Sequence, residues 1–321
     1  MQATRNFPFK VGYQSTGYPP PPKGGFIRRI SYSPNAVPYF FVLPFLISFA
    51  LFFVYPLFST VQMSFQEING FNDVKFIGLQ NYANLLNDRF FSAVRVTMTY
   101  TFWTIFVLVP LPLVLAVLLN SKLRVGARFF KPALFIPQLT SVIVAGIFFR
   151  FAFSDTPTAL INTIVGVLGI GPVPWLKEAV PTMFTLVALC VWRWLGVNIV
   201  YFLSGLQGIS GELYEAAAID GAGSWGQFIH ITLPSIKPTI IYVITISVYG
   251  GFAMFSESYS LFLTARTPGE IGSTMVGYLY QQAFVEARMG FGAAAGVVLL
   301  LLVMIINVLQ LKFFGAFKKE E

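Results

Sequence analysis

The chain has 321 residues, of which 56% are hydrophobic and 11% charged. Soluble domains carry about 25% charged residues, so this composition excludes a soluble globular protein and a disordered one and indicates a polytopic membrane protein. The net charge of +8 fits Lys and Arg beside lipid headgroups, while one Cys and one His exclude a disulfide framework and a Cys- or His-built metal site.

The chain begins with a polar stretch, residues 1–38, that includes a run of prolines and predicts a cytoplasmic tail. Six apolar stretches follow, each close to the roughly 20 residues that a membrane-spanning helix needs. In none of them do apolar and polar residues alternate as in a strand of a membrane β-barrel. We therefore expect helices, in which every backbone hydrogen bond is made within the segment. They are 39–63, 94–120, 133–153, 183–206, 238–262 and 289–314. We expect an all-α membrane protein with six transmembrane helices in one domain over 39–314, and a cytoplasmic tail at 315–321.

The orientation of these spans is predicted by the positive-inside rule. With the N-terminus inside, thirteen Lys and Arg residues fall in inner segments and five in outer loops. The inner group is Arg5, Lys10, Lys23, Arg28, Arg29, Lys122, Arg124, Arg128, Lys131, Lys237, Lys312, Lys318 and Lys319. Both termini are therefore predicted on the cytoplasmic side.

The fourth span carries polar and aromatic residues on one helical face, namely Trp194, Asn198 and Tyr201. An aromatic ring packs against sugar C–H groups, and an amide both donates to and accepts from hydroxyls, so this face suits a saccharide. Packing, or an aromatic belt at the membrane interface, explains the tryptophan equally well. Arg193 is costly at depth and needs a partner, for which Glu257 is a candidate.

The inner segment 207–237 is long for a loop in so apolar a chain and predicts two short helices around a turn. Ser210 is placed to cap the first helix, and Gly221 is placed to end it in the left-handed conformation. Ser224 starts a capping-box spacing for the second helix, which Pro234 is expected to end. An exposed helix pair of this kind fits a partner groove, and two helices lying on the membrane surface are an equal alternative.

The fifth span places Ser247, Gly251 and Met254 on one helical face. Gly251 leaves room for a ligand or for a crossing helix, and close helix packing is the stronger interpretation of that glycine alone.

The 207–237 segment contains the residues that identify a family. Glu215-Ala-Ala-Ala-Ile-Asp220-Gly221-Ala222, followed at fixed positions by Phe228, Leu233, Pro234 and Pro238, resembles the EAA loop of ATP-binding-cassette importer permeases. Phe76-Ile-Gly-Leu-Gln-Asn81-Tyr82 resembles the external loop of the carbohydrate permeases of that family. Gly277-Tyr-Leu-Tyr-Gln-Gln282 is similar to the first permease of arabino-oligosaccharide importers.

This resemblance implies a type I importer transmembrane domain in a bacterial cytoplasmic membrane. Two related permeases would form the pore, two ATPase subunits would hold ATP and Mg²⁺, and an extracytoplasmic binding protein would deliver an oligosaccharide. The chain itself is then no enzyme and binds no cofactor, and its sequence has no Gly-x-x-x-x-Gly-Lys-[Ser/Thr] segment to hold phosphates.

The resemblance also implies two sets of functional residues. The implied contacts to the ATPases are Glu215, Ala216, Ala217, Asp220, Gly221, Ala222, Phe228 and Pro234. The family's substrate site lies near mid-membrane on the counterparts of spans four and five, which favours a site built from Trp194, Asn198, Tyr201, Ser247, Gly251 and Met254.

An ion-coupled secondary transporter that works without an ATPase is the competing hypothesis. It requires a membrane carboxylate that binds protons or sodium, and Glu257 is the candidate. It leaves the long 207–237 segment unexplained.

Overall fold

The computed structural model describes residues 37–69, 73–120 and 127–315. The chain divides into two compact units, residues 1–59 and 60–321. Most of both predicted tails, and nine of the thirteen predicted inner cations, lie outside the described residues.

The first unit contains the apolar helix predicted over 39–63. It consists of α2 (Val37–Phe49), a π-helical turn η1 (Ala50–Val54) and most of α3 (Tyr55–Met63). The segment Tyr39–Met63 is long and apolar enough to cross a bilayer, so the predicted bounds are confirmed. Its large apolar side chains are exposed, as expected of a helix that contacts lipid or another subunit.

The second unit opens with a small antiparallel sheet, in which β1 (Gln66–Asn69) pairs with β2 (Asp73–Phe76). The short helix α4 (Gln80–Asn84) follows. Asn81 ties α4 back to the first strand, since its Nδ2 donates to the carbonyls of Ser64 and Gln66 at 3.0 and 2.9 Å.

The next span is longer than predicted. It consists of α5 (Asp88–Leu108) and α6 (Pro110–Asn120), which together form one apolar helix that begins six residues before the predicted position 94. The start is set by Asn87, whose side-chain oxygen accepts the N–H of Phe90 at 3.0 Å, as an N-cap does.

The third predicted span, 133–153, is not one straight helix. It contains most of α7 (Ala127–Leu139) and α8 (Val142–Ala152), and the two helices meet at an angle of 97°. Pro137 lies close before the break and lacks an N–H for the helical ladder, and Ser141 has an extended backbone. The short helix α9 (Leu160–Val167) follows.

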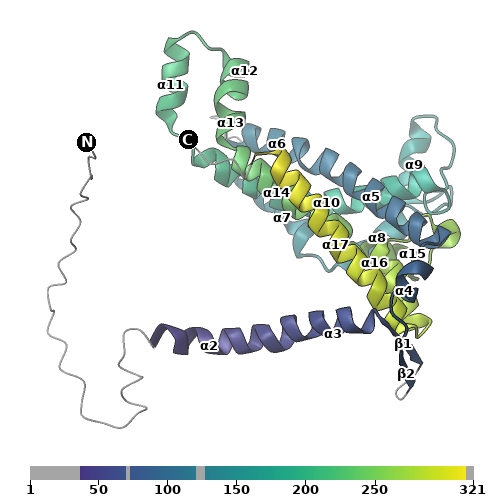
Figure 1. The fold of residues 1–321 in the computed structure, drawn as a ribbon. Coiled ribbons are helices and arrows are strands. Elements are labelled where there is room, and N and C mark those ends of the chain that lie inside the picture. The colour runs from purple at the N-terminus through teal and green to yellow at the C-terminus, as the bar shows by residue number, and fades with distance from the viewer. Residues whose placement is uncertain (1–36, 70–72, 121–126, 316–321) are drawn as a thin grey trace, which may run out of the picture. The chain divides into compact units, whose positions relative to one another are not determined.

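The fourth span is the uninterrupted helix α10 (Ala179–Gln207). It leads into α11 (Gly211–Ile219), α12 (Ser224–Gln227), the π-helical turn η2 (Phe228–Thr232) and α13 (Leu233–Ser235). Figure 1 shows α11 and α12 projecting from one end of the second unit, with β1 and β2 at the opposite end.

The prediction of a continuous fifth span over 238–262 is wrong. α14 (Lys237–Phe252) ends ten residues early, and α15 (Ser256–Phe262) is a separate helix. Phe255 has φ −140° and ψ −54°, outside the helical region, and the carbonyl of Met254 accepts a hydrogen bond from Thr274 Oγ1 at 2.8 Å. The backbone at this break is therefore satisfied by tertiary contacts that hydropathy does not report.

The last part of the chain is again helical. A 3-10 turn η3 (Pro268–Glu270), the helix α16 (Met275–Tyr280) and a π-helical turn η4 (Gln281–Val285) lead to α17 (Met289–Phe313), which matches the sixth predicted span within a residue. In the described residues, four helices can cross a bilayer by length and hydropathy, and up to six spans result if each of two bent pairs counts as one.

Three clusters of buried side chains hold the second unit together. One joins α5, α8, α10 and α15, a second joins α5, α14, α16 and α17, and a third joins α6, α10 and α14. α10 is the central helix of this unit, because it packs against α5, α6, α7, α8, α14 and α15.

Candidate functional site

The exposed helix pair after α10 has the local structure that its sequence predicts. Ser210 Oγ accepts the N–H of Glu212 at 3.3 Å. At the other end of α11, Gly221 has φ +80°, and the N–H of Ala222 donates to the carbonyl of Ala217 at 2.8 Å. This hydrogen bond, with that from Gly221 to Ala218, forms the Schellman motif that ends a helix at a glycine.

The second helix of the pair differs from the prediction at both ends. Its N-cap is Gly223 rather than Ser224, so no side chain caps the helix, and Gln227 Nε2 donates to the carbonyl of Ala222 at 3.2 Å. Pro234 does not end the helix, which continues to Ser235. The wider π-helical turn η2 directly before it gives room to the proline ring, which clashes with the preceding turn of a regular helix.

A hydrogen bond joins the two helices, because the Tyr214 hydroxyl and Thr232 Oγ1 lie 2.9 Å apart. Within the second helix, the rings of Trp225 and Phe228 stack with centroids 5.6 Å apart. Ile219 is nevertheless 87% exposed. The pair is thus an ordered surface with apolar side chains free to contact a partner.

The predicted ATPase contacts divide by exposure. Five are exposed, and three are half-buried. The exposed residues are Glu215, Ala216, Asp220, Gly221 and Pro234, and the half-buried residues are Ala217, Ala222 and Phe228. A carboxylate therefore lies beside apolar side chains on one protruding element, a chemistry that suits a groove on another protein.

The predicted substrate residues of α10 lie in three different environments. Asn198 is buried, and its Nδ2 donates to the carbonyl of Leu108 at 3.0 Å. Trp194 is half-buried and packs against the cluster between α5, α8 and α10. Tyr201 is half-buried, with its ring edge-on to Tyr242 at 5.2 Å between centroids.

The predicted substrate residues of the fifth span do not share one continuous helix face. A Cβ added at Gly251 would collide with the side chain of Thr101 in α5, so this glycine permits close packing of α14 on α5. Ser247 is half-buried on α14. Met254 lies beyond the end of that helix, buried in the core.

The partner predicted for Arg193 is confirmed. Its Nη1 donates to Glu257 Oε1 at 3.2 Å, which joins α10 to α15. Glu257, the carboxylate on which an ion-coupled transporter would depend, is therefore engaged in an ion pair.

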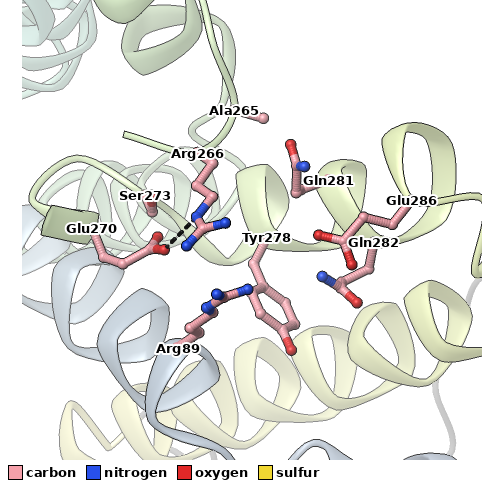
Figure 2. Close-up of a pocket in the computed structure, with 9 residues that line it drawn as sticks. All are labelled: Arg89, Ala265, Arg266, Glu270, Ser273, Tyr278, Gln281, Gln282 and Glu286. Atoms are coloured by element: carbon pink, nitrogen blue, oxygen red, sulfur yellow. Dashed lines mark hydrogen bonds and ion pairs between the residues drawn. The ribbon is translucent and has the colours of Figure 1, made fainter. Parts of the chain in front are cut away.

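A polar cleft beyond the predicted spans was not foreseen from the sequence. Figure 2 shows it, with Arg89 from the start of α5, Tyr278 from α16 and the Arg266–Glu270 ion pair at 3.2 Å. A neighbouring cleft shares four of its residues, which are Arg89, Tyr278, Gln282 and Glu286. The signal that sequence analysis overlooked is the alternation of cationic, acidic and amide residues between Arg266 and Arg288.

Tyr278 is the titratable group of this cleft whose pKa is perturbed. Burial raises the pKa of its phenol above 10.0, and the hydrogen bond from Asn87 Nδ2 at 3.1 Å opposes that shift. The phenol is therefore neutral at physiological pH and joins α5 to α16 as a hydrogen-bond acceptor.

The sequence matches, over residues 82–313, the family described as the binding-protein-dependent transport system inner membrane component. It is 51% identical over 293 residues to the arabinooligosaccharides transport system permease protein AraP of Bacillus subtilis, covering 91% of this chain and 93% of that protein. It is 49% identical to AraP of Halalkalibacterium halodurans, covering 90% and 91%. The lactose transport system permease protein LacF of Rhizobium radiobacter is 30% identical over 87% of this chain and 94% of its own length.

Solved structures agree with this match at the level of the fold. The chain resembles a subunit of a bacterial ABC transporter involved in the import of the acidic polysaccharide alginate, with a TM-score of 0.76 and 22% identity over 88% of this chain and 96% of that chain. A bacterial alginate ABC transporter in complex with an alginate pentasaccharide-bound periplasmic protein gives a TM-score of 0.77 at 22% identity, over 88% of this chain and 95% of that chain.

Proposed function

The chain belongs to the family of binding-protein-dependent transport system inner membrane components, and from this premise we propose that it is a permease subunit of an ATP-driven arabino-oligosaccharide importer. The observation that carries the substrate class is the 51% identity to AraP over more than nine tenths of both chains. Relatives named for lactose are more distant, at 30% identity.

The proposed topology has six spans in one transmembrane domain over 39–314, with both termini in the cytoplasm. The four long apolar helices, the bent pair of α7 and α8, and the apolar helix α14 support this count. The excess of Lys and Arg in the predicted inner segments supports the orientation. In this topology α11 and α12 face the cytoplasm, and the β1–β2 hairpin and the polar clefts face the opposite side of the bacterial cytoplasmic membrane.

The partners in this proposal are a second, homologous permease, two ATPase subunits that hold ATP and Mg²⁺, and an extracytoplasmic binding protein that delivers the sugar. ATP binding brings the two ATPases together and carries the helix pairs of both permeases with them, so that the spans open outward. Hydrolysis resets the inward-facing state. The exposed, internally braced helix pair supports its role as the coupling element, through the eight residues from Glu215 to Pro234 named above.

The proposed substrate site involves Trp194, Tyr201 and Ser247 as contacts, because each is only half-buried. Asn198, Gly251 and Met254 belong to the same region but are engaged in helix packing, and we assign them the shaping of the site. A sugar in the pathway would then contact aromatic faces and a hydroxyl.

Binding-protein-dependent stimulation of ATPase activity tests this proposal. The chain is reconstituted with its neighbouring permease and an ATPase subunit, and binding protein loaded with arabino-, malto- or galacto-oligosaccharides is added in turn. We expect stimulation by the arabino-oligosaccharide. Stimulation by another sugar alone would overturn the substrate, and sugar uptake driven by an ion gradient without ATP would overturn the importer.

A further inference from the structure

A largely buried ion pair links α10, the central helix of the second unit, to the short helix α15. Arg193 of α10 and Glu257 of α15 are 3.2 Å apart, with side chains 11% and 14% exposed. Tyr100 and Cys190 are buried in the apolar cluster that joins α5, α8, α10 and α15. Charges so far from water persist only when they are paired.

Arg193 is not fully satisfied by this contact. Its Nε is buried and has no hydrogen-bond partner among the described residues. The hydrogen bond of this guanidinium that the structure shows is therefore the one directed at α15, through Nη1.

The segment 207–237, here called the coupling segment, is joined to α10 at one end and to α14 at the other. Arg193 lies on α10, and Glu257 lies on α15, which follows α14. α10 continues unbroken from Arg193 to Gln207, a distance of about 21 Å at the rise of an α-helix, and α11 begins four residues later. The other route, along α14, is interrupted between Phe252 and Ser256. The uninterrupted path from this segment to α15 therefore runs along α10, which meets α15 through the ion pair and through the apolar cluster that both helices share.

α15 is in turn held to other elements on its far side. A Cβ at Gly146 of α8 would overlap the side chain of Ser260, so α8 and α15 pack in close contact. Ser258 Oγ donates to the carbonyl of Gly272 at 2.6 Å, which ties α15 to the segment that leads into α16. A displacement of α15 thus reaches the wall of the polar cleft.

We propose that the Arg193–Glu257 pair is the link through which movement of the coupling helices reaches α15 and the cleft-lining segment beyond it. The inference rests on the proposed function and adds two positioning residues to it, neither of which is itself one of the proposed contacts to the sugar or to the ATPases. Without the pair, the complex hydrolyses ATP but α15 no longer follows α10, so hydrolysis is separated from transport.

The test compares sugar uptake with stimulated ATPase activity in the same proteoliposomes. The main variant is the double substitution Arg193→Met with Glu257→Gln, because removing both charges avoids an unpaired buried charge and preserves folding. Lys177→Gln is the control, since it removes the exposed Lys177–Asp155 pair of similar length, 3.3 Å. The exchanged variant Arg193→Glu with Glu257→Arg restores the pair in reverse.

We expect the double variant to lose about tenfold in uptake, within the usual range of coupling free energies, while its ATPase activity changes less than about twofold. The control retains both activities, and the exchanged variant recovers uptake. Wild-type uptake per ATP in the double variant, or an equal fall in uptake and hydrolysis, overturns the inference. A wild-type complex without stimulated ATPase activity overturns the proposed function itself, so the two failures are distinguishable.

Discussion

The side-chain amide of Asn198 donates to the carbonyl of Leu108, 3.0 Å away in a neighbouring helix. That carbonyl faces Pro112, four residues later, which has no N–H to close the helical hydrogen bond. Asn198 thus supplies the donor that proline removes, and it fixes α10 to the junction of α5 and α6. Its position on the predicted sugar-facing side of α10 does not decide its role, because its hydrogen bond is directed at the backbone.

Replacing Asn198 with Ala therefore changes stability before it changes sugar recognition. The substitution leaves the buried Leu108 carbonyl without a donor, which costs about 1–3 kcal/mol. The expected result is a lower unfolding temperature of the purified complex with an unchanged sugar concentration for half-maximal transport. A large rise in that concentration at wild-type stability would instead make Asn198 a sugar contact.

The close packing of α14 on α5 at Gly251 is tested by substituting this glycine and, as a control, the neighbouring Gly250. Gly251→Ala places a methyl group against Thr101, and overpacking of this kind costs about 1–3 kcal/mol. Gly250→Ala has nothing within 4 Å of the added Cβ. Thermal unfolding of both variants in detergent is the measurement. Equal unfolding temperatures for the two variants would contradict the close approach of α14 to α5.

The turn between α11 and α12 depends on the left-handed backbone of Gly221. Gly221→Ala imposes roughly 1–2 kcal/mol of strain at φ +80°. Gly223→Ala is the matched control, because Gly223 has φ −69° and open space around its Cβ position. Co-purification of the ATPase subunit with each variant is the readout, and it falls only for Gly221→Ala. Loss of the ATPase with both variants would point to the loop as a whole.

Substitutions of two glutamates of α11 distinguish contact with the ATPase from a contribution to the stability of the helix. We expect Glu215→Ala to abolish sugar-stimulated ATPase activity, because it removes the exposed carboxylate proposed to enter the ATPase groove. Glu212→Ala removes an exposed charge from the first turn and costs only about 0.3–1 kcal/mol of helix stability. If both variants insert into the membrane and retain stimulation, α11 is not the coupling helix.

The raised pKa of Tyr278 predicts that the protein loses stability at alkaline pH. Its pKa is raised by burial, so the folded state favours the neutral phenol. The stabilisation is complete below the unfolded pKa of about 10 and is lost as the pH rises through the higher folded value. The unfolding temperature of the wild type should therefore fall more steeply above pH 10 than that of Tyr278→Phe. Parallel curves would show that this phenol stays exposed to solvent.

Much of the fold could be predicted because lipid limits the backbone to helices. The spans beginning at Tyr39, Ala179 and Met289 agree with the predicted stretches within a few residues. The breaks in the third and fifth spans could not be predicted from hydropathy. The break in the fifth span is stabilised by a non-local hydrogen bond, from Thr274 Oγ1 to the Met254 carbonyl, and the break in the third follows Pro137, and hydropathy encodes neither feature.

The coupling segment was more predictable than the substrate site for a physical reason. Its turn depends on local rules, a cap at Ser210 and a left-handed glycine at Gly221, and both are confirmed. Whether Asn198 or Gly251 faces a cavity or a neighbouring helix depends on which helix lies beside it. Helical periodicity gives the shared face but does not say what that face contacts.

Uptake of labelled arabino-oligosaccharide into proteoliposomes that contain the full complex tests the central claim most directly. We expect uptake only when binding protein is present on the external side of the permease and ATP is present on the side of the ATPases. Uptake without ATP under an imposed proton or sodium gradient, or no uptake of this sugar while another oligosaccharide accumulates, would contradict it.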